Sequence, residues 1–441
     1  DVGHLTDDAD AGEDKMEKMA AQQAQSIWDI AEHYKQAYWA DVRALNIRQP
    51  AQWTVATDYV PQMIEFAKGI ADKHCYELES GLYFDVSTVA DYALLAGRHT
   101  QEQLAEADEA HMRIDPVKDK RNAADFAIWR KTPAGETRQM EWDSPWGRGA
   151  PGWHLECSVM SGEVLGFPFD IHTGGIDHRE IHHPNEIAQN QAFCCTNGLD
   201  DPRNSGAKIW MHNNFLVERS GKMSKSSGEF LRLQLLVDKG YHPLAYRLMC
   251  LQAHYRSELE FSWEGLGAAL TRLKRMVMGT LPMRDDVEAP ELLHAGVIEQ
   301  DETPLLERSR IISGPIDPKI GQLIARFDEA MSDDLNTPSA LTALEELISL
   351  KRVNLIEKRD AIKSLCEVLG LNLFGLTRAD LRIRPKTATI TEAEITAALV
   401  RRTEARAAKD FATSDAIRDE LAAAGVEVMD GDPLGWEWRL G

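Results

Sequence analysis

Residues 152–189 read GWHLECSVMSGEVLGFPFDIHTGGIDHREIHHPNEIAQ. Residues 155–165 have a helical pattern, and residues 167–172 are typical of a short strand that Thr173-Gly-Gly175 ends. A second helix starts near Pro184, since proline suits the first turn of a helix. Helices that alternate with strands predict an α/β fold.

This stretch contains three candidate metal ligands. His182 and Glu186 stand four residues apart at a helix start, so their side chains share one face. Cys157 lies upstream on a separate element, and thiolate, imidazole and carboxylate are all zinc ligands. His183 shares that face less readily and is the second choice for the imidazole. A buried cysteine near a helix-capping pair is the plainer interpretation of these residues alone.

Two further features suit a nucleotide. Gly174-Gly175-Ile-Asp177 ends a strand and precedes a helix, where open α/β sheets bind ligands and a carboxylate can accept hydrogen bonds from ribose. Lys222-Met-Ser224-Lys225-Ser226 lies in a glycine-flanked loop after a strand expected over 209–217. Its lysines suit the charge on a departing pyrophosphate. By composition alone, a solvated basic loop is the simpler interpretation.

Length and composition place limits on the molecule. A chain of 441 residues predicts two to four domains, and 43% hydrophobic with 27% charged residues is typical of a globular protein without membrane spans. The six cysteines are few and irregularly spaced, which indicates thiols of a reducing cytoplasm and no disulfide framework. The net charge of -22 argues against a surface that coats nucleic acid generally, although one basic face remains compatible with it.

The rest of the chain is mostly helical. A helix over 13–46, a helix over 61–73 and a strand over 82–86 precede a turn-rich segment. Residues 230–369 predict a helical bundle, and a linker at 378–388 follows. The last part is expected to form two helices and a hairpin: 392–409, 413–424, 426–429 and 436–439. The hairpin tryptophans, Trp436 and Trp438, either stack on bases or pack on the two helices.

Together these segments closely resemble the cysteinyl-tRNA synthetases, a family of class I aminoacyl-tRNA synthetases. Four segments match the family's catalytic blocks in order: 151–158, 170–177, 182–189 and 222–226. Residues 120–129 and 144–147 look like the family's approach to the first block, and residues 405–439 resemble its anticodon-binding unit. Four ordered blocks outweigh the plainer interpretations of the single motifs.

The resemblance implies an α/β fold with a Rossmann-like class I catalytic domain over 1–230, interrupted by a connective insertion at about 80–150. It further implies a stem-contact region over 231–280 and a tRNA-binding helical bundle over 281–380. A small α+β anticodon-binding unit over 390–441 would complete the chain.

The resemblance also implies a site and a reaction. Zinc would be held by Cys157, His182 and Glu186 plus a second cysteine, with the substrate thiolate joining the metal and Trp153 lining the pocket. The nucleotide would bind at Gly174, Gly175, Asp177 and Lys225, and the pyrophosphate would be stabilised by Lys222, Ser224 and Lys225. The implied enzyme converts L-cysteine and ATP, with Mg²⁺, to cysteinyl-adenylate and then charges tRNA(Cys). We expect it to be a cytoplasmic monomer that binds no membrane.

Two departures from the family pattern matter. Pro184 stands where the family usually has glutamate, and both neighbouring ligands remain. The family's first strand, with one zinc-ligand cysteine and a His-Ile-Gly-His signature, is not found in residues 1–441. We expect both features upstream of Asp1, so that residues 1–441 alone bind zinc weakly and do not activate cysteine.

Two other functions remain open. One is a ligase that joins cysteine to an amino sugar, against which the anticodon-type unit after residue 390 argues. The other is a regulatory or RNA-binding relative that has lost ATP binding. The intact Lys222–Ser226 loop and the three metal ligands argue against that second alternative.

Overall fold

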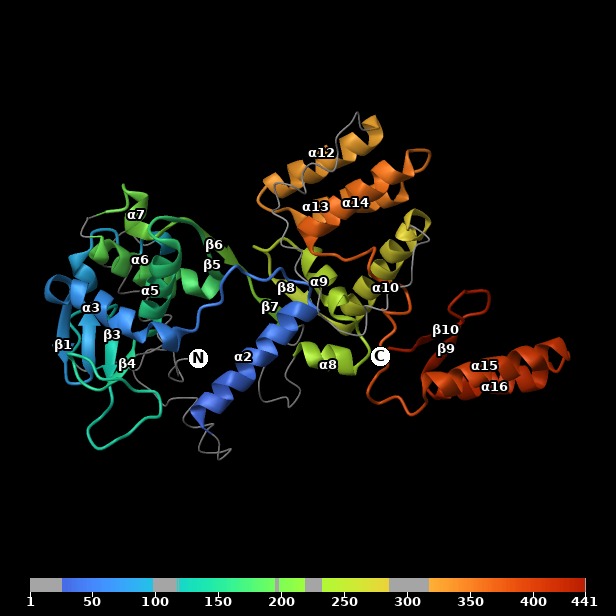
Figure 1. Ribbon diagram of the computed structural model, residues 1–441, viewed down its shortest axis with the longest axis horizontal. Helices are drawn as coiled ribbons and strands as arrows, with labels where there is room; N and C mark the ends of the chain where they lie inside the picture. The colour runs from blue at the N-terminus through green and yellow to red at the C-terminus, as the bar shows by residue number, and fades with distance from the viewer. Residues whose placement is uncertain are drawn as a thin grey trace. The chain divides into compact units, whose positions relative to one another are not determined.

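The computed structural model describes residues 26–97, 117, 119–194, 198–218, 232–284 and 317–440. The chain divides into two compact units: Asp1–Trp39 with Pro50–Phe215, and Ala40–Gln49 with Leu216–Gly441 (Figure 1). Helix α2 (Ile27–Ala44) begins in the first unit and ends in the second. It accounts for most of the helix predicted over 13–46, whose first part lies outside the described residues. In the described part of the chain, no helix is long and apolar enough to cross a membrane.

A four-stranded antiparallel sheet, with its strands in chain order, forms one part of the first unit. Its strands are β1 (Cys75–Leu78), β2 (Gly81–Phe84), β3 (Phe126–Lys131) and β4 (Gly149–Pro151). Gly81 has a φ of +150°, and a Cβ atom there would lie 2.0 Å from the carbonyl oxygen of Trp129, so the β1–β2 hairpin requires glycine.

Helix α3 (Val60–His74) packs on this sheet and matches the helix predicted over 61–73. The short 3₁₀ helix η1 (Ala56–Tyr59) precedes α3. Pro61 lies in the first turn of α3, where proline is tolerated. The core between helix and sheet is apolar and closely packed; among its fully buried members are Met63, Ile70, Phe84, Ile128, Trp129 and Leu155.

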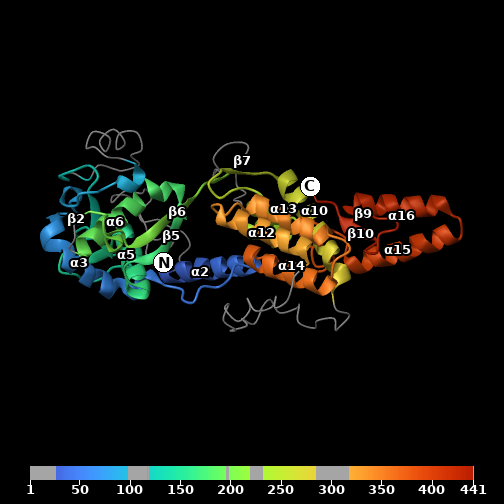
Figure 2. The ribbon, with the colours of Figure 1, turned by 90° about the horizontal axis from the view of Figure 1, so that it is seen from above.

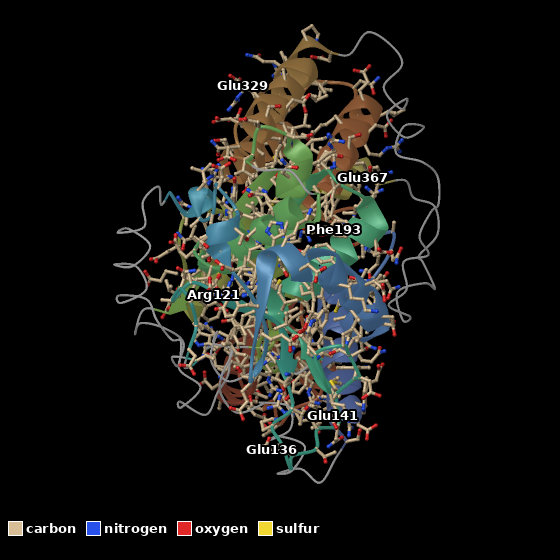
Figure 3. All side chains as sticks on the ribbon, turned by 90° about the vertical axis from the view of Figure 1, so that its left-hand side faces the viewer. Arg121, Glu136, Glu141, Phe193, Glu329 and Glu367 are labelled. Carbon is tan, nitrogen blue, oxygen red and sulfur yellow. The ribbon has the colours of Figure 1, made fainter. Side chains whose placement is uncertain are left out.

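The second part of the first unit is a β–α–β crossover. It contains α5 (Trp153–Leu165), β5 (Phe169–Gly175), η4 (Ile176–Arg179), α6 (His182–Phe193), α7 (Pro202–Ser205) and β6 (Ala207–Asn213). Strands β5 and β6 pair in parallel (Figure 2). Helix α6 is buried from its first residue to Ala192. At the end of α6, Phe193 (labelled in Figure 3) stacks on Phe66 of α3 with ring centroids 4.3 Å apart. Ala188 and Ala192 of α6 belong to the core of this unit, in which most of this largely polar helix is buried.

Two strand predictions in this region were wrong. Thr173-Gly-Gly175 does not end the strand, because β5 stays paired with β6 as far as the Gly175–Asn213 pair. The strand predicted over 209–217 is two strands, since Asn214 and Phe215 separate β6 from β7 (Leu216–Glu218). β7 pairs in parallel with β8 (Leu259–Phe261), so the two halves of the predicted strand belong to different sheets and different units.

The second unit is built on a helical bundle, which confirms the prediction for the described residues of the range 230–369. Its described helices are α8 (Leu233–Asp238), α9 (Pro243–Leu251), α10 (Trp263–Thr280), α12 (Pro318–Ser332), α13 (Thr337–Ser349) and α14 (Leu355–Leu369). Asn354 caps α14 by accepting from the backbone N–H groups of Ile356 and Glu357, and Gly370 ends it in the left-handed conformation. Fully buried aliphatic residues such as Leu273, Leu344 and Ile362 fill the core.

The last part of the chain is a helical pair with a hairpin, as predicted. Helices α15 (Glu392–Ala407) and α16 (Phe411–Ala423) lie beside the antiparallel strands β9 (Val426–Val428) and β10 (Trp436–Trp438) (Figure 1). Thr391 and Glu394 form a capping box at the start of α15. Trp436 and Trp438 are 4% and 6% exposed and belong to the core of this part, so they pack on the helices and present no face to a base.

Candidate functional site

The crossover brings together the three residues that the sequence nominated as metal ligands. Cys157 lies on the second turn of α5, and His182 and Glu186 lie one turn apart at the start of α6. One donor atom from each lies within 4.8 Å of the other two. His182 and Glu186 are buried, whereas Cys157 is partly exposed. Of the two adjacent histidines, His182 is the one that joins Cys157 in this set.

Hydrogen bonds orient the His182 ring. Its Nδ1 lies 2.9 Å from Nδ1 of His154, a buried residue on α5. Its Nε2 lies 3.1 Å from Oε1 of Glu186. Because His154 occupies one ring nitrogen, the other is directed at the carboxylate, as in metal sites whose histidine ligands are held by a hydrogen bond at the opposite nitrogen.

Glu186 is an ionised carboxylate in a buried position. Burial by itself would raise the pKa of Glu186, but hydrogen bonds from His172 and His182 lower it to about 2. Nε2 of His172 lies 3.2 Å from Oε1 of Glu186. The Glu186 carboxylate is therefore available as a charged oxygen ligand at neutral pH.

The Cys157 thiol has the opposite tendency. Burial raises its pKa well above the ordinary value, and the negative charges of Glu186 and Glu156 add to the effect. A divalent cation would stabilise the thiolate, and binding would release a proton. Sulfur, nitrogen and oxygen donors within a few ångströms of one another fit zinc, whose ligand bonds are about 2.0–2.3 Å long.

Further histidines surround this set, and of these the sequence had suggested only His183, as the second choice for the imidazole ligand. His172 and His183 form a second candidate set with Glu186, and Nδ1 of His183 lies 2.8 Å from Nε2 of His212 on β6. Burial lowers the pKa of His183 to about 3, so this ring is neutral. His178 lies nearby, with its ring centroid 5.0 Å from that of His182. The sequence did contain one indication of this cluster, because six of the chain's 14 histidines lie within residues 154–212.

The predicted pocket and nucleotide residues lie around the same cluster. The ring centroid of Trp153 is 4.3 Å from that of His182, so this indole borders the metal set. Gly174 and Gly175 lie at the end of β5, and Asp177 follows in η4 with its side chain exposed. A Cβ atom on Gly174 would lie 2.7 Å from the His183 ring, so packing against that ring also requires glycine there.

Some predicted residues cannot be placed. Lys222, Ser224 and Lys225 lie outside the described residues.

Comparison with protein families gives three matches along the chain. Residues 2–271 match the model of the tRNA synthetases class I (C) catalytic domain, and residues 326–374 match the DALR domain. Residues 391–439 match the cysteinyl-tRNA ligase anticodon binding domain. With an α/β first unit and a helical second unit, the chain is a class I aminoacyl-tRNA synthetase, and the predicted fold class is confirmed.

Relatives that align over the whole chain identify the family within class I. The chain is 70% identical over 440 residues to the cysteine–tRNA ligase of Novosphingobium aromaticivorans, covering 100% of this chain and 83% of that protein. It is 51% identical over 453 residues to the cysteine–tRNA ligase of Zymomonas mobilis, covering 100% and 85%. The chain therefore belongs to the cysteine–tRNA ligase family, and the resemblance stated from its motifs is confirmed.

The chain also aligns over most of its length with a solved structure. Methionyl-tRNA synthetase from Mycobacterium tuberculosis, in complex with methionyl-adenylate, covers 80% of this chain and 79% of its own, with a TM-score of 0.44 and 14% identity.

The anticodon-binding match over residues 391–439 disfavours the amino-sugar ligase, which has no use for such a domain.

Proposed function

We propose that the protein containing residues 1–441 uses ATP and Mg²⁺ to convert L-cysteine to cysteinyl-adenylate and then charges tRNA(Cys), with a zinc ion that selects the substrate thiol. The observation that carries the proposal is the convergence of Cys157, His182 and Glu186 in a partly buried set with one ionised carboxylate. Family membership supports the reaction, and the donor set supports the metal.

In this proposal, Cys157, His182 and Glu186 hold the metal, and His154 and His172 orient two of these ligands through hydrogen bonds. When bound, zinc supplies an open position that favours a thiolate over the hydroxyl of serine. Trp153 borders this position and limits the space for larger side chains. Selection would then rest on ligand chemistry, because one hydrophobic contact discriminates too weakly.

The remaining roles are also part of the proposal. Gly174, Gly175 and Asp177 would contact the nucleotide at the end of β5, where parallel strands bind ligands. Lys222, Ser224 and Lys225 would stabilise the departing pyrophosphate by charge and hydrogen bonding. In this reaction no side chain need form a covalent bond to the substrate, so positioning and electrostatics would supply the rate. We further propose a cytoplasmic monomer that binds no membrane.

Cobalt(II) can replace zinc as a spectroscopic probe of this set. Cobalt(II) added to the chain is expected to give a thiolate charge-transfer band that Cys157→Ser removes and Cys250→Ala leaves unchanged. L-cysteine is expected to intensify the band in the unsubstituted chain, while L-serine at equal concentration does not. An identical response to the two amino acids would refute selection by the metal.

ATP–pyrophosphate exchange tests the reaction. Exchange should depend on L-cysteine in a chain that includes the His-x-Gly-His signature, and its absence there would refute the proposed function. That residues 1–441 alone bind zinc weakly and give no exchange remains a prediction, which metal analysis and the same assay check.

A further inference from the structure

The C-terminal part of the second unit, residues 388–440, is attached to the bundle by a group of charged side chains. Glu437 lies on β10, and its side chain is only 11% exposed. Its Oε2 accepts from Nζ of Lys274 on α10 at 2.8 Å, and its Oε1 accepts from Nε of Arg378 in the linker at 3.1 Å. One carboxylate thus bridges three segments that lie far apart in the sequence.

Arg378 extends this network along the hairpin. Its guanidinium also donates to Asp432, in the turn between β9 and β10, and lies 3.3 Å from Sδ of Met429. The hydrogen bond from Arg378 lowers the pKa of Asp432, so this carboxylate is ionised. Lys274 and Arg378 therefore face Glu437 and Asp432, which makes the group electrically neutral.

The linker is held at two further points. The Arg382 guanidinium lies 3.6 Å from the centroid of a Trp436 ring and donates to the Trp436 carbonyl oxygen at 3.2 Å. The backbone N–H of Lys386 donates to the carbonyl oxygen of Asp238 on the bundle at 2.7 Å. Residues 378–386 therefore follow one path between the bundle and the hairpin.

Apolar contact also links the two parts. Among the described residues, Leu440 is the side chain that packs against both the bundle core and the core of the C-terminal part. Apolar contact tolerates sliding, whereas half-buried charges are satisfied only when each meets its partner. The charged side chains are therefore all paired only when the C-terminal part keeps this arrangement on the bundle.

We propose that Lys274, Arg378 and Glu437 form an ionic joint that fixes the orientation of residues 388–440 before tRNA binds, which makes them positioning residues for anticodon recognition. The joint itself follows from the contacts of this chain alone. Its role toward tRNA rests on the proposed function. A part that is already oriented loses less conformational freedom on binding, and this raises the affinity.

Amide hydrogen exchange tests the joint. In Lys274→Met and Glu437→Gln, the Lys386 amide is expected to exchange about tenfold faster, because its bond to Asp238 is no longer held in register. Amides within α15 and α16 should stay protected, which shows that the C-terminal part remains folded. Lys274→Arg keeps the cation and should retain the slow exchange.

Glu346→Gln is the matched control for the exchange experiment. It removes an exposed pair with Arg326 elsewhere on the bundle and should leave Lys386 unchanged. Unchanged exchange at Lys386 in both Lys274→Met and Glu437→Gln would refute the joint.

Binding of a tRNA(Cys) transcript tests the positioning role. Lys274→Met removes a positive charge and Glu437→Gln removes a negative one, so direct attraction to the phosphates would change the two affinities in opposite directions. The joint predicts that both variants bind about five- to tenfold more weakly, with Lys274→Arg near the unsubstituted chain. Tighter binding by Glu437→Gln would refute the positioning role. No binding by the unsubstituted chain would refute the proposed function and the role toward tRNA, while amide exchange still decides whether the joint exists.

Discussion

Replacement of Glu186 by glutamine is expected to weaken zinc binding strongly. Glutamine preserves the size of the side chain but removes the charge that His172 and His182 stabilise at 3.2 Å and 3.1 Å. Four-ligand structural zinc sites bind with about 10–16 kcal/mol, or roughly 2.5–4 kcal/mol per ligand. At about 1.4 kcal/mol per tenfold change, loss of one ligand raises the dissociation constant between about 60-fold and about 700-fold.

Competition with a chromophoric zinc chelator at pH 7 measures this change directly. Asp125→Asn is the matched control, because Asp125 is also a buried carboxylate of the first unit. It accepts from the Tyr76 hydroxyl at 2.7 Å and from the backbone N–H of Val86 at 3.0 Å, and it does not belong to the metal set. Its replacement should lower stability and leave the zinc affinity within about twofold.

Two outcomes would contradict this reasoning. Equal zinc affinity in the Glu186→Gln chain and the unsubstituted chain would show that the carboxylate is not a ligand. A larger loss with His183→Ala than with His182→Ala would show that the second set, with His172, holds the metal. Near-ultraviolet circular dichroism of each variant without metal checks that the first unit remains folded.

Three further predictions concern stability. Gly152→Ala should cost more than about 3 kcal/mol in urea unfolding of the first unit, because a Cβ atom would lie 1.9 Å from the Ala127 carbonyl oxygen; a cost below about 1 kcal/mol would contradict this. The hydrogen bond from Arg402 lowers the pKa of Asp430 from 3.8 to about 2, so the pair stabilises the C-terminal part above pH 3.8 and the effect is lost as the pH falls toward 2. Asp430→Asn should lower the stability by about 1 kcal/mol at pH 7, a value reduced because this carboxylate is exposed. Thermal unfolding should show a difference in stability between the variant and the unsubstituted chain at pH 7 and none near pH 2. Leu344→Ala should destabilise the bundle by about 2–5 kcal/mol in urea unfolding, since Leu344 is fully buried, and a smaller cost would indicate a core that relaxes around the cavity.

Local features of this chain were predictable because they depend on neighbouring residues. His182 and Glu186 share a helix face by the geometry of one helical turn. The hairpin and helices after residue 390 follow from short-range periodicity and from capping residues such as Thr391 and Glu394.

The strand predictions failed where the conformation of a residue depends on a partner that is distant in the sequence. Gly174 suggested that the strand ends there, yet it lies inside β5. The His183 ring occupies the space that a Cβ atom on Gly174 would need. Asn214 and Phe215 carried no strong turn signal, and only the separate partners of β6 and β7 divide the predicted strand. Trp436 and Trp438 were ambiguous for the same reason, because the alternation along a strand does not say what covers each face.

The sequence by itself determined the family, the α/β and helical parts, and the identity of the metal-binding candidates, because ordered motifs and short periodicities are properties of the chain. Only the tertiary structure decided that Cys157 meets His182, that His154 and His172 hold the two ligands on α6, and that Glu437 meets Lys274 from 163 residues away. These contacts arise where separate helices and strands pack. Their geometry depends on the crossover between β5 and β6 and on the docking of whole elements, which no local pattern encodes.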